Sequence, residues 1–143
     1  MKVLLCCLLL VSVAAPRLVA ADSIWSALVL GVNERPPPPP DRHLVPLLSH
    51  LLPVFGYNTY YLLGKKKQKI VEGDETWLVP SKEFYFRVVC LAREKNAYRI
   101  KAELYRKKEL LLETEARLAR DEPLLIGGPG WGDGKLILIL RIP

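Results

Sequence analysis

The glycine-rich stretch at residues 123–140 is the first candidate for chemistry. It reads PLLIGGPGWGDGKLILIL, with five glycines around Trp131. A Walker-type phosphate loop needs Gly-Lys followed by Ser or Thr and then a helix, whereas Gly134-Lys135 precedes alternating aliphatic residues. The dinucleotide-binding fingerprint also needs a helix after its glycines. The stretch therefore predicts a β-hairpin with Asp133-Gly134 at its turn and Gly134 at a positive φ.

Residue types that form catalytic or metal sites are sparse. His43 and His50 are seven positions apart, which puts them on one side of a helix but supplies too few ligands for zinc. Cys90 falls on the predicted buried side of a strand, where a thiol acts as a small apolar group. The hydrolase motif Gly-x-Ser-x-Gly and the metalloprotease motif His-Glu-x-x-His are absent from the sequence. We therefore expect no catalytic residues, no metal, no cofactor and no enzymatic activity.

A lysine run is the strongest charge feature, with four lysines within five residues: Lys65, Lys66, Lys67 and Lys69. Such a run can contact anionic lipid, polysaccharide or nucleic acid. Lysines also protect a sheet edge against association with other strands, and we favour that role. The modest net charge disfavours nucleic acid.

Aromatic residues offer a second kind of contact surface: Tyr57, Tyr60, Tyr61, Trp77, Tyr85 and Tyr98. Exposed rings of this kind bind sugars in carbohydrate-binding modules, and buried ones build a core. Trp131 has the same two alternatives, packing across the end of a sheet or meeting a partner. The candidate partner-binding residues are Trp131, Lys65, Lys66, Lys67, Tyr60 and Trp77.

The elements that would position these residues are mainly strands. In residues 83–92, EFYFRVVCLA, apolar and polar positions alternate with a period of two. Residues 135–142, KLILILRI, are aliphatic on both faces and predict a central or covered strand. Shorter strands are predicted at residues 57–63, 69–71 and 76–79. The fold class is an antiparallel β-sandwich or a partly open barrel.

Residues 98–120 contain many strong helix formers, yet their pattern favours a hairpin. Apolar residues alternate with charged ones on both sides of Lys107-Lys108. A helix would scatter these apolar positions around its circumference, whereas a hairpin puts them on one face. On the other face, Arg99 and Lys101 would lie opposite Glu113 and Glu115.

One short helix is predicted before the sheet. Leucines and a phenylalanine recur at spacings of three and four between residues 44 and 55. Asp41 is expected to cap the start of this helix and Pro53 to limit its end. Residues 22–41 form an N-terminal segment whose prolines, residues 36–40, act as a stiff spacer. A single β-rich domain is expected at residues 42–143.

Residues 1–21 have the layout of a secretory signal. Lys2 precedes an apolar run, and Ala20-Ala21 ends the stretch with small residues, so cleavage is expected after Ala21. The main alternative is an uncleaved anchor, although the run is short for a membrane span. Removing residues 1–21 changes the net charge from +6 to +4, with 19 basic and 15 acidic side chains left. Cys90 is then the single cysteine, and no Asn-x-Ser/Thr sequon is present.

The order of FGYNTYYLLG, WLVPSKEF and PLLIGGPGWGDGKLILIL resembles small exported single-domain proteins of unknown function from Gram-negative bacteria. The resemblance covers residues 54–142 and implies a periplasmic or extracellular protein, without implying an activity. We expect a non-enzymatic protein that binds another cell-envelope component, with a protein of a surface or secretion assembly as its partner and a polysaccharide as the alternative. The alternatives are a carbohydrate-binding module and an inhibitor of a secreted hydrolase whose active site accepts the glycine-rich tip.

Overall fold

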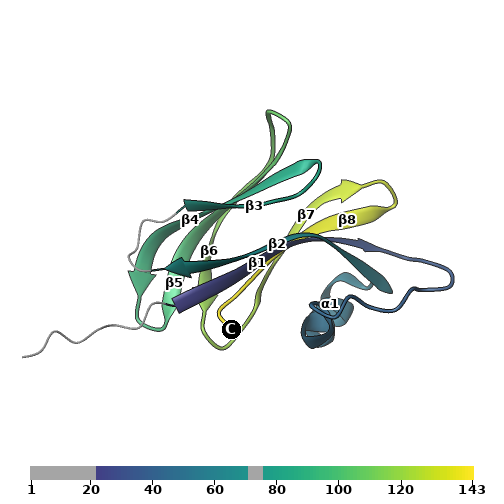
Figure 1. The fold of residues 1–143 in the computed structure, drawn as a ribbon, viewed down its shortest axis with the longest axis horizontal. Coiled ribbons are helices and arrows are strands. Elements are labelled where there is room, and N and C mark those ends of the chain that lie inside the picture. Colours follow the sequence, from purple (N-terminus) through teal and green to yellow (C-terminus); the bar gives the residue numbers. More distant parts are fainter. Residues whose placement is uncertain (1–21, 71–75) are drawn as a thin grey trace, which may run out of the picture.

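The computed structural model describes residues 22–70 and 76–143, which form two four-stranded antiparallel sheets and one short helix (Figure 1). Sheet A has the order β2 (Thr59–Ile70), β1 (Asp22–Val32), β8 (Gly134–Arg141) and β7 (Leu124–Trp131). Sheet B has the order β3 (Thr76–Val79), β4 (Phe84–Glu94), β5 (Ala97–Arg106) and β6 (Glu109–Ala119). The expected mainly β, sandwich-like fold with one short helix is confirmed.

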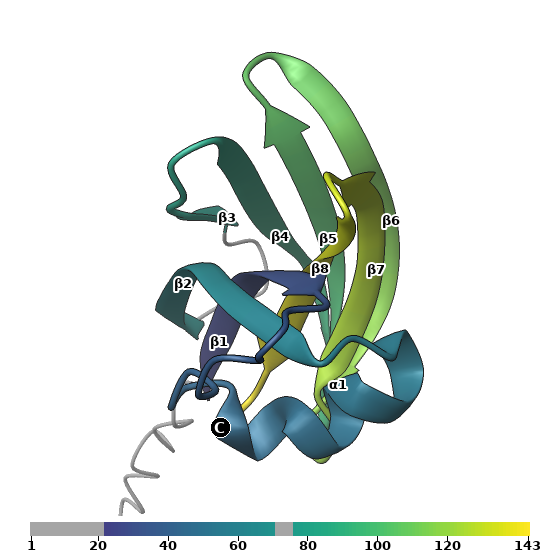
Figure 2. The same ribbon diagram turned by 90° about the vertical axis from the view of Figure 1, so that its right-hand side faces the viewer.

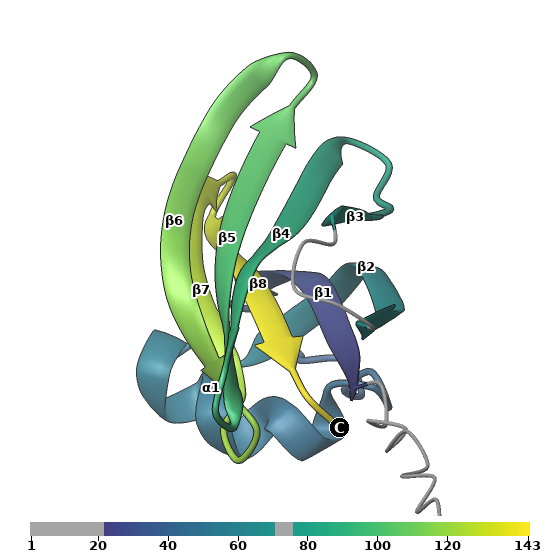
Figure 3. The same cartoon turned by 90° about the vertical axis from the view of Figure 1, so that its left-hand side faces the viewer.

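The two sheets meet along their edges, where β6 lies beside β7 and β2 beside β3 (Figures 2 and 3). Neither of these two pairs is joined in the hydrogen-bonded sheets, so the strands do not form a closed barrel. Consecutive strands are neighbours all the way around, and β1 pairs with β8. The β5–β6 hairpin projects beyond the other strands.

The main core fills the space between the sheets. Phe86, Tyr98, Ile100 and Leu138 are fully buried within it. The predicted hairpin at residues 98–120 is confirmed, with Lys107 and Lys108 between the strands and Ile100 opposite Ala116. Apolar alternation prevails over helix propensity here because burying one whole face of both strands outweighs the small propensity differences.

The position of strand β1 differs from the sequence-based expectation, which placed residues 22–41 before the β-rich domain. It lies between β2 and β8 in sheet A. Its side chains are apolar on both sides, with Leu28 in the main core and Val29 in a second cluster. The proline-rich segment therefore connects two adjoining strands. Asn58 fastens it, since the Asn58 side chain accepts from the Glu34 amide at 2.9 Å and donates to the Glu34 carbonyl at 3.0 Å.

The helix covers the face of sheet A that points away from sheet B (Figure 1). A 3₁₀ turn, η1 (Val45–Leu47), leads into α1 (Leu48–Phe55). Asp41 does not cap α1, which begins at Leu48 with Leu47 at its N-cap; the Asp41 carboxylate instead accepts from the His43 amide at 2.8 Å, in the turn before η1. Pro53 lies inside the helix, which ends at Gly56 with a φ of 72°. The predicted apolar face is confirmed, and it buries Leu44, Leu47 and Leu51 over Ala27, Val29, Ile137 and Ile139.

The glycine-rich hairpin is confirmed, but its expected special glycine is wrong. The turn residues are Gly132 and Asp133, and Gly132 has the positive φ of 58°. This is the position that carries glycine in a type II′ turn. Gly134 is required for a different reason: a Cβ there would lie 2.2 Å from the Gly31 carbonyl oxygen, so β1 and β8 could not approach.

The predicted signal peptide, residues 1–21, lies outside the described residues. Within residues 22–70 and 76–143, none of the helices has both the length and the apolar character needed to cross a membrane.

Candidate partner-binding site

Two of the expected contact residues belong to the interior. Tyr60 is 5% exposed, and its hydroxyl donates to the Leu51 carbonyl at 3.0 Å. Trp77 is 3% exposed, and its indole nitrogen donates to the Ser26 hydroxyl at 3.1 Å. Burial of the rings and pairing of their polar atoms correct the expectation that Tyr60 and Trp77 contact a partner.

Trp131 packs across the end of the sandwich. Its ring meets Phe84 edge to face, with centroids 5.0 Å apart, and the Arg106 guanidinium lies 4.4 Å from its centroid. The side chain is partly buried and contacts the main core. Of the two alternatives for Trp131, the structure therefore shows packing, with Arg106 covering the ring.

Lys65, Lys66 and Lys67 are exposed, as expected for an edge strand. They belong to β2, which lies at the edge of sheet A. The Lys65 ammonium lies 2.7 Å from Nε2 of His43, whose Nδ1 is 3.0 Å from the Asp41 carboxylate. This contact attaches the segment before α1 to the edge strand.

The outer face of sheet B carries aromatic, aliphatic and charged side chains that lie close together. Strand register places them in two adjoining rows, which we call the platform. The first row is Tyr85, Tyr105 and Leu110, and the second is Leu78, Arg87, Glu103 and Glu113. Large apolar side chains in these rows are unusually exposed, at 56% for Tyr85, 47% for Leu78 and 45% for Leu110.

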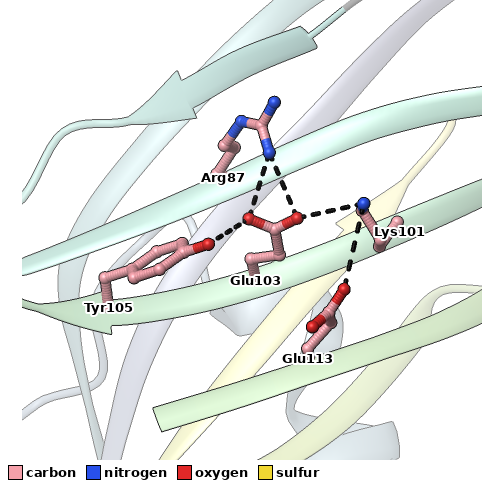
Figure 4. A network of polar contacts seen from close by, with 5 residues as sticks. All are labelled: Arg87, Lys101, Glu103, Tyr105 and Glu113. Carbon is pink, nitrogen blue, oxygen red and sulfur yellow. Dashed lines mark hydrogen bonds and ion pairs between the residues drawn. The ribbon is translucent and has the colours of Figure 1, made fainter. Parts of the chain in front are cut away.

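Glu103 forms the centre of the platform (Figure 4). Although it points to the outer face, it is only 3% exposed. Both carboxylate oxygens accept from Nη1 of Arg87 at 3.1 Å, and the Tyr105 hydroxyl donates to one of them at 2.6 Å. The Lys101 ammonium lies 3.3 Å from Glu103 and 3.9 Å from Glu113. Together with Lys101, which lies beside the second row, Arg87 balances the charges of the two carboxylates of the platform.

These contacts shift the pKa of the Glu103 carboxyl. The hydrogen bond from Tyr105, with further contributions from Arg87 and Lys101, lowers the pKa of Glu103 against the opposing effect of burial. The same hydrogen bond raises the pKa of the Tyr105 hydroxyl. A carboxylate with this many donors remains ionised at neutral pH and is a poor proton donor or acceptor. Its effect is to hold Arg87 and Tyr105 in place.

A second polar cluster joins the two sheets at the opposite end. The Asp22 carboxylate of β1 accepts from the hydroxyl of Tyr98 on β5 and from the guanidinium of Arg120. Its pKa is lowered, chiefly by Arg120. Burial, followed by the bond to Asp22, raises the pKa of Tyr98 to about 12. The Asp22 side chain is mostly buried, and both of its carboxylate oxygens accept hydrogen bonds. This cluster therefore links the two sheets.

Other sites for chemistry are limited. Cys90 is 1% exposed on the core side of β4. His50 is exposed on α1, and His43 is engaged by Asp41 and Lys65. Across residues 22–70 and 76–143, no group of three or more His, Cys, Asp or Glu side chains is arranged to hold a metal ion.

A groove of about 500 Å³ separates the proline-rich segment from α1 and β2. Its walls are largely apolar and include Pro38, Leu48, Leu52 and Tyr61. The groove shows that the prolines line the surface of the domain beside α1.

The platform could be recognised from the sequence only in part. Tyr85 was among the candidate aromatics, and the predicted hairpin placed Lys101 and Glu113 on the solvent side. Bringing Tyr85 beside Tyr105 depends on the β4–β5 register, which includes a bulge between Cys90 and Ala92. A bulge has no reliable signature in a single sequence.

Comparison with protein-family models, curated proteins and solved structures finds no match to this chain. The resemblance to exported Gram-negative proteins stays a prediction, and the functional proposal rests on the geometry of this chain.

Proposed function

We propose that this protein is an exported, non-enzymatic binding domain that attaches to another protein of the cell envelope through the platform. The observation that carries the proposal is the row of Tyr85, Tyr105 and Leu110, with Tyr85 and Leu110 largely exposed, beside the fixed Arg87–Glu103 pair. Tyrosine and arginine dominate the energetics of protein interfaces, because they bury a large area and keep a polar group available.

The electrostatics of the platform favour a protein partner over a polyanion. Arg87 and Lys101 balance Glu103 and Glu113, so a nucleic acid or an acidic polymer gains little there. The Arg87 side chain is 40% exposed while bound to Glu103, so it can meet a partner without being reoriented. Fixing these side chains before binding lowers the entropy cost of association.

A binding role is also supported by the state of the buried carboxylates. Asp22 and Glu103 each accept several hydrogen bonds within the domain, which leaves neither poised to transfer a proton. The signal-like residues 1–21 and the resemblance to exported single-domain proteins support a periplasmic or extracellular location. An accessory role in a surface or secretion assembly is consistent with a small domain that presents exposed aromatic and charged side chains on the outer face of sheet B.

Site-specific photocrosslinking in cells that produce the protein tests this proposal. A photoreactive amino acid in place of Tyr85 should give a discrete crosslinked adduct, whereas the same residue in place of Glu115 should not. Glu115 is a suitable control because its side chain is 54% exposed on the same sheet outside the platform. The double variant Tyr85→Arg/Leu110→Arg should lower recovery of that adduct partner by at least about tenfold. Equal adducts at both positions, or full recovery by the double variant, would show that the platform is not the contact surface.

A carbohydrate-binding module is the second candidate, because Tyr85 and Tyr105 are neighbours across two strands, beside the carboxylate of Glu103. Affinity electrophoresis in isolated cell-wall and capsular polysaccharides tests this function. Retardation that disappears in Tyr85→Ala would support it, and unchanged mobility in every polysaccharide would remove it.

A further inference from the structure

The outer face of sheet A, on the side of α1, carries only basic charges from its strands. In an antiparallel pair, residues opposite each other point to the same side of the sheet. Trp25 and Ala27 pack in the cluster under α1, and their partners on β2 are Lys67 and Lys65. By the same rule, Lys69, Lys135 and Arg141 also point to this side of the sheet. We call this surface the basic face, and its residues are Lys65, Lys67, Lys69, Lys135 and Arg141.

These cations lack the pairing found on sheet B. In the part of the chain that the structure describes, no lysine or arginine of the sheet A strands forms an ion pair with a carboxylate. The strands of sheet A hold six basic residues and one acidic residue, Asp22, which is engaged between the sheets. On sheet B, by contrast, Arg87, Arg99, Lys101 and Arg117 all contact carboxylates.

The surrounding segments do not neutralise the basic face. Residues 33–58 contain two acidic and two basic residues, Glu34, Arg35, Asp41 and Arg42, so their charges cancel. The β6–β7 turn places Asp121 and Glu122 near Arg141, and because Arg120 is bound to Asp22, these two carboxylates offset two of the five positive charges and leave the face basic. The acidic residues Glu72, Asp74 and Glu75 lie outside the described residues.

Exposed aliphatic side chains lie on the same side of sheet A. Val54 is 64% exposed, Val45 51% and Leu52 46%, all in the helical segment that covers this face. The core does not need them, since Leu44, Leu47 and Leu51 provide the buried contacts of that segment. An element packed on a sheet stands about 10 Å above it. The helical segment therefore stands above the basic residues of the strands. Its exposed aliphatic side chains lie on its flanks, since Leu52 and Val54 are two positions apart in α1 and Leu52 lines the groove beside the proline-rich segment.

We propose that the basic face docks on a membrane surface rich in anionic phospholipid, with the lysines among the phosphates and the helical segment that carries Val45, Leu52 and Val54 in the interfacial region. Interfacial helical segments enter the boundary region by about 5–10 Å while basic residues contact the headgroups. An acidic polysaccharide or a nucleic acid would use the cations but would gain nothing from three exposed aliphatic residues. The contact is peripheral and leaves the platform on sheet B free.

Vesicle co-sedimentation of the full chain tests this proposal. We expect binding to vesicles of equal parts phosphatidylcholine and phosphatidylglycerol, and weak binding to phosphatidylcholine alone. Each basic residue near an anionic surface contributes about a fivefold gain in partitioning, so Lys65→Gln/Lys67→Gln/Lys69→Gln should lose about a hundredfold. The matched control Lys82→Gln/Lys95→Gln/Lys108→Gln removes three exposed charges elsewhere and should lose only a few-fold. Residues 1–21 are the same in all variants, so they cannot create the difference.

Several outcomes would overturn the proposal. Equal losses in the two triple variants would mean that net charge alone governs binding. Equal binding to both vesicle types would mean that the basic face plays no part. If Val45→Ser/Val54→Ser binds as well as the unchanged chain, and polygalacturonate competes fully with vesicles, the face is a general polyanion site. The platform variants should keep full vesicle binding, which separates this proposal from the proposed function.

Discussion

In sheet A, strand β8 is buried on both sides, whereas in sheet B, strand β5 is buried toward the core and carries charged side chains outward. The difference follows from what covers each sheet. The helical segment shields the outer face of sheet A near its centre, so β8 can be aliphatic throughout. The outer face of sheet B has no such cover and is stabilised by paired charges. Two sheets that share one core can therefore present a basic surface and a neutral one.

The largest effect should come from the doubly covered strand. Leu138→Ala removes a fully buried side chain from the main core and should lower the free energy of unfolding by about 3 kcal/mol. Leu110→Ala, on the outer face of sheet B, should cost less than about 0.5 kcal/mol. Urea denaturation followed by tryptophan fluorescence measures both. Similar losses would show that the outer face of sheet B is packed as tightly as the core.

Close strand approach in sheet A gives the next effect. Gly134→Ala places a Cβ 2.2 Å from the Gly31 carbonyl oxygen and 2.5 Å from Val32, and should cost about 2–3 kcal/mol. Gly132→Ala meets no atom within 4 Å, and only its positive φ opposes the change, at about 1 kcal/mol. Thermal unfolding of the two variants ranks them. The reverse order would mean that the turn, and not the β1–β8 contact, demands glycine.

The paired charges of sheet B should differ according to burial. Glu103→Gln leaves Arg87 and Lys101 without their central counter-charge and should cost about 1–2 kcal/mol, a value reduced by the partial exposure of both cations. Glu115→Gln breaks a pair that is more than half exposed and should cost less than about 0.5 kcal/mol.

The acid dependence of stability provides a check on Glu103. Because folding lowers the pKa of Glu103, its contribution is present at neutral pH and is lost as the pH falls below the ordinary value toward the folded pKa. Glu103→Gln should therefore show a shallower loss of stability in acid, measured by urea denaturation over a pH series. An unchanged slope would place the acid sensitivity elsewhere, with Asp22 as the next residue to replace.

The smallest effect concerns the link between the sheets. Folding raises the pKa of Tyr98 from 10.0 to about 12, so its contribution is complete below pH 10 and is lost as the pH rises through the folded pKa. Tyr98→Phe should flatten, without removing, the decline in stability over this window, because the pKa values of Tyr60 and Tyr105 are also raised. A decline as steep as in the unchanged chain would contradict the link through Asp22.

Local pattern predicted much of the fold correctly. The alternation in residues 98–120 predicted the β5–β6 hairpin and its charged face, where Arg99 now pairs with Glu115 at 3.3 Å. A period-two pattern on both sides of a short turn determines which residues share a face. The strand at residues 76–79 and the covered final strand are confirmed for the same reason.

Expectations that depended on distant contacts were less successful. The segment containing β1 was placed before the domain, because nothing in a single sequence shows that residues 22–32 pair with β2 and β8. Tyr60 and Trp77 were expected at the surface, yet their polar atoms find buried partners on Leu51 and Ser26. An aromatic residue with a polar group suits either environment, and only its neighbours decide between them.

The sequence by itself determined the β5–β6 hairpin, the strand at residues 76–79, the covered final strand and the inward and outward sides of these elements. Only the tertiary structure decided that Tyr85, Tyr105 and Leu110 form one row, that five cations share one face of sheet A and that Gly134 must be a glycine. The physical reason is that periodicity is a property of neighbours along the chain, whereas these three outcomes depend on strand register and on backbones distant in sequence coming into contact.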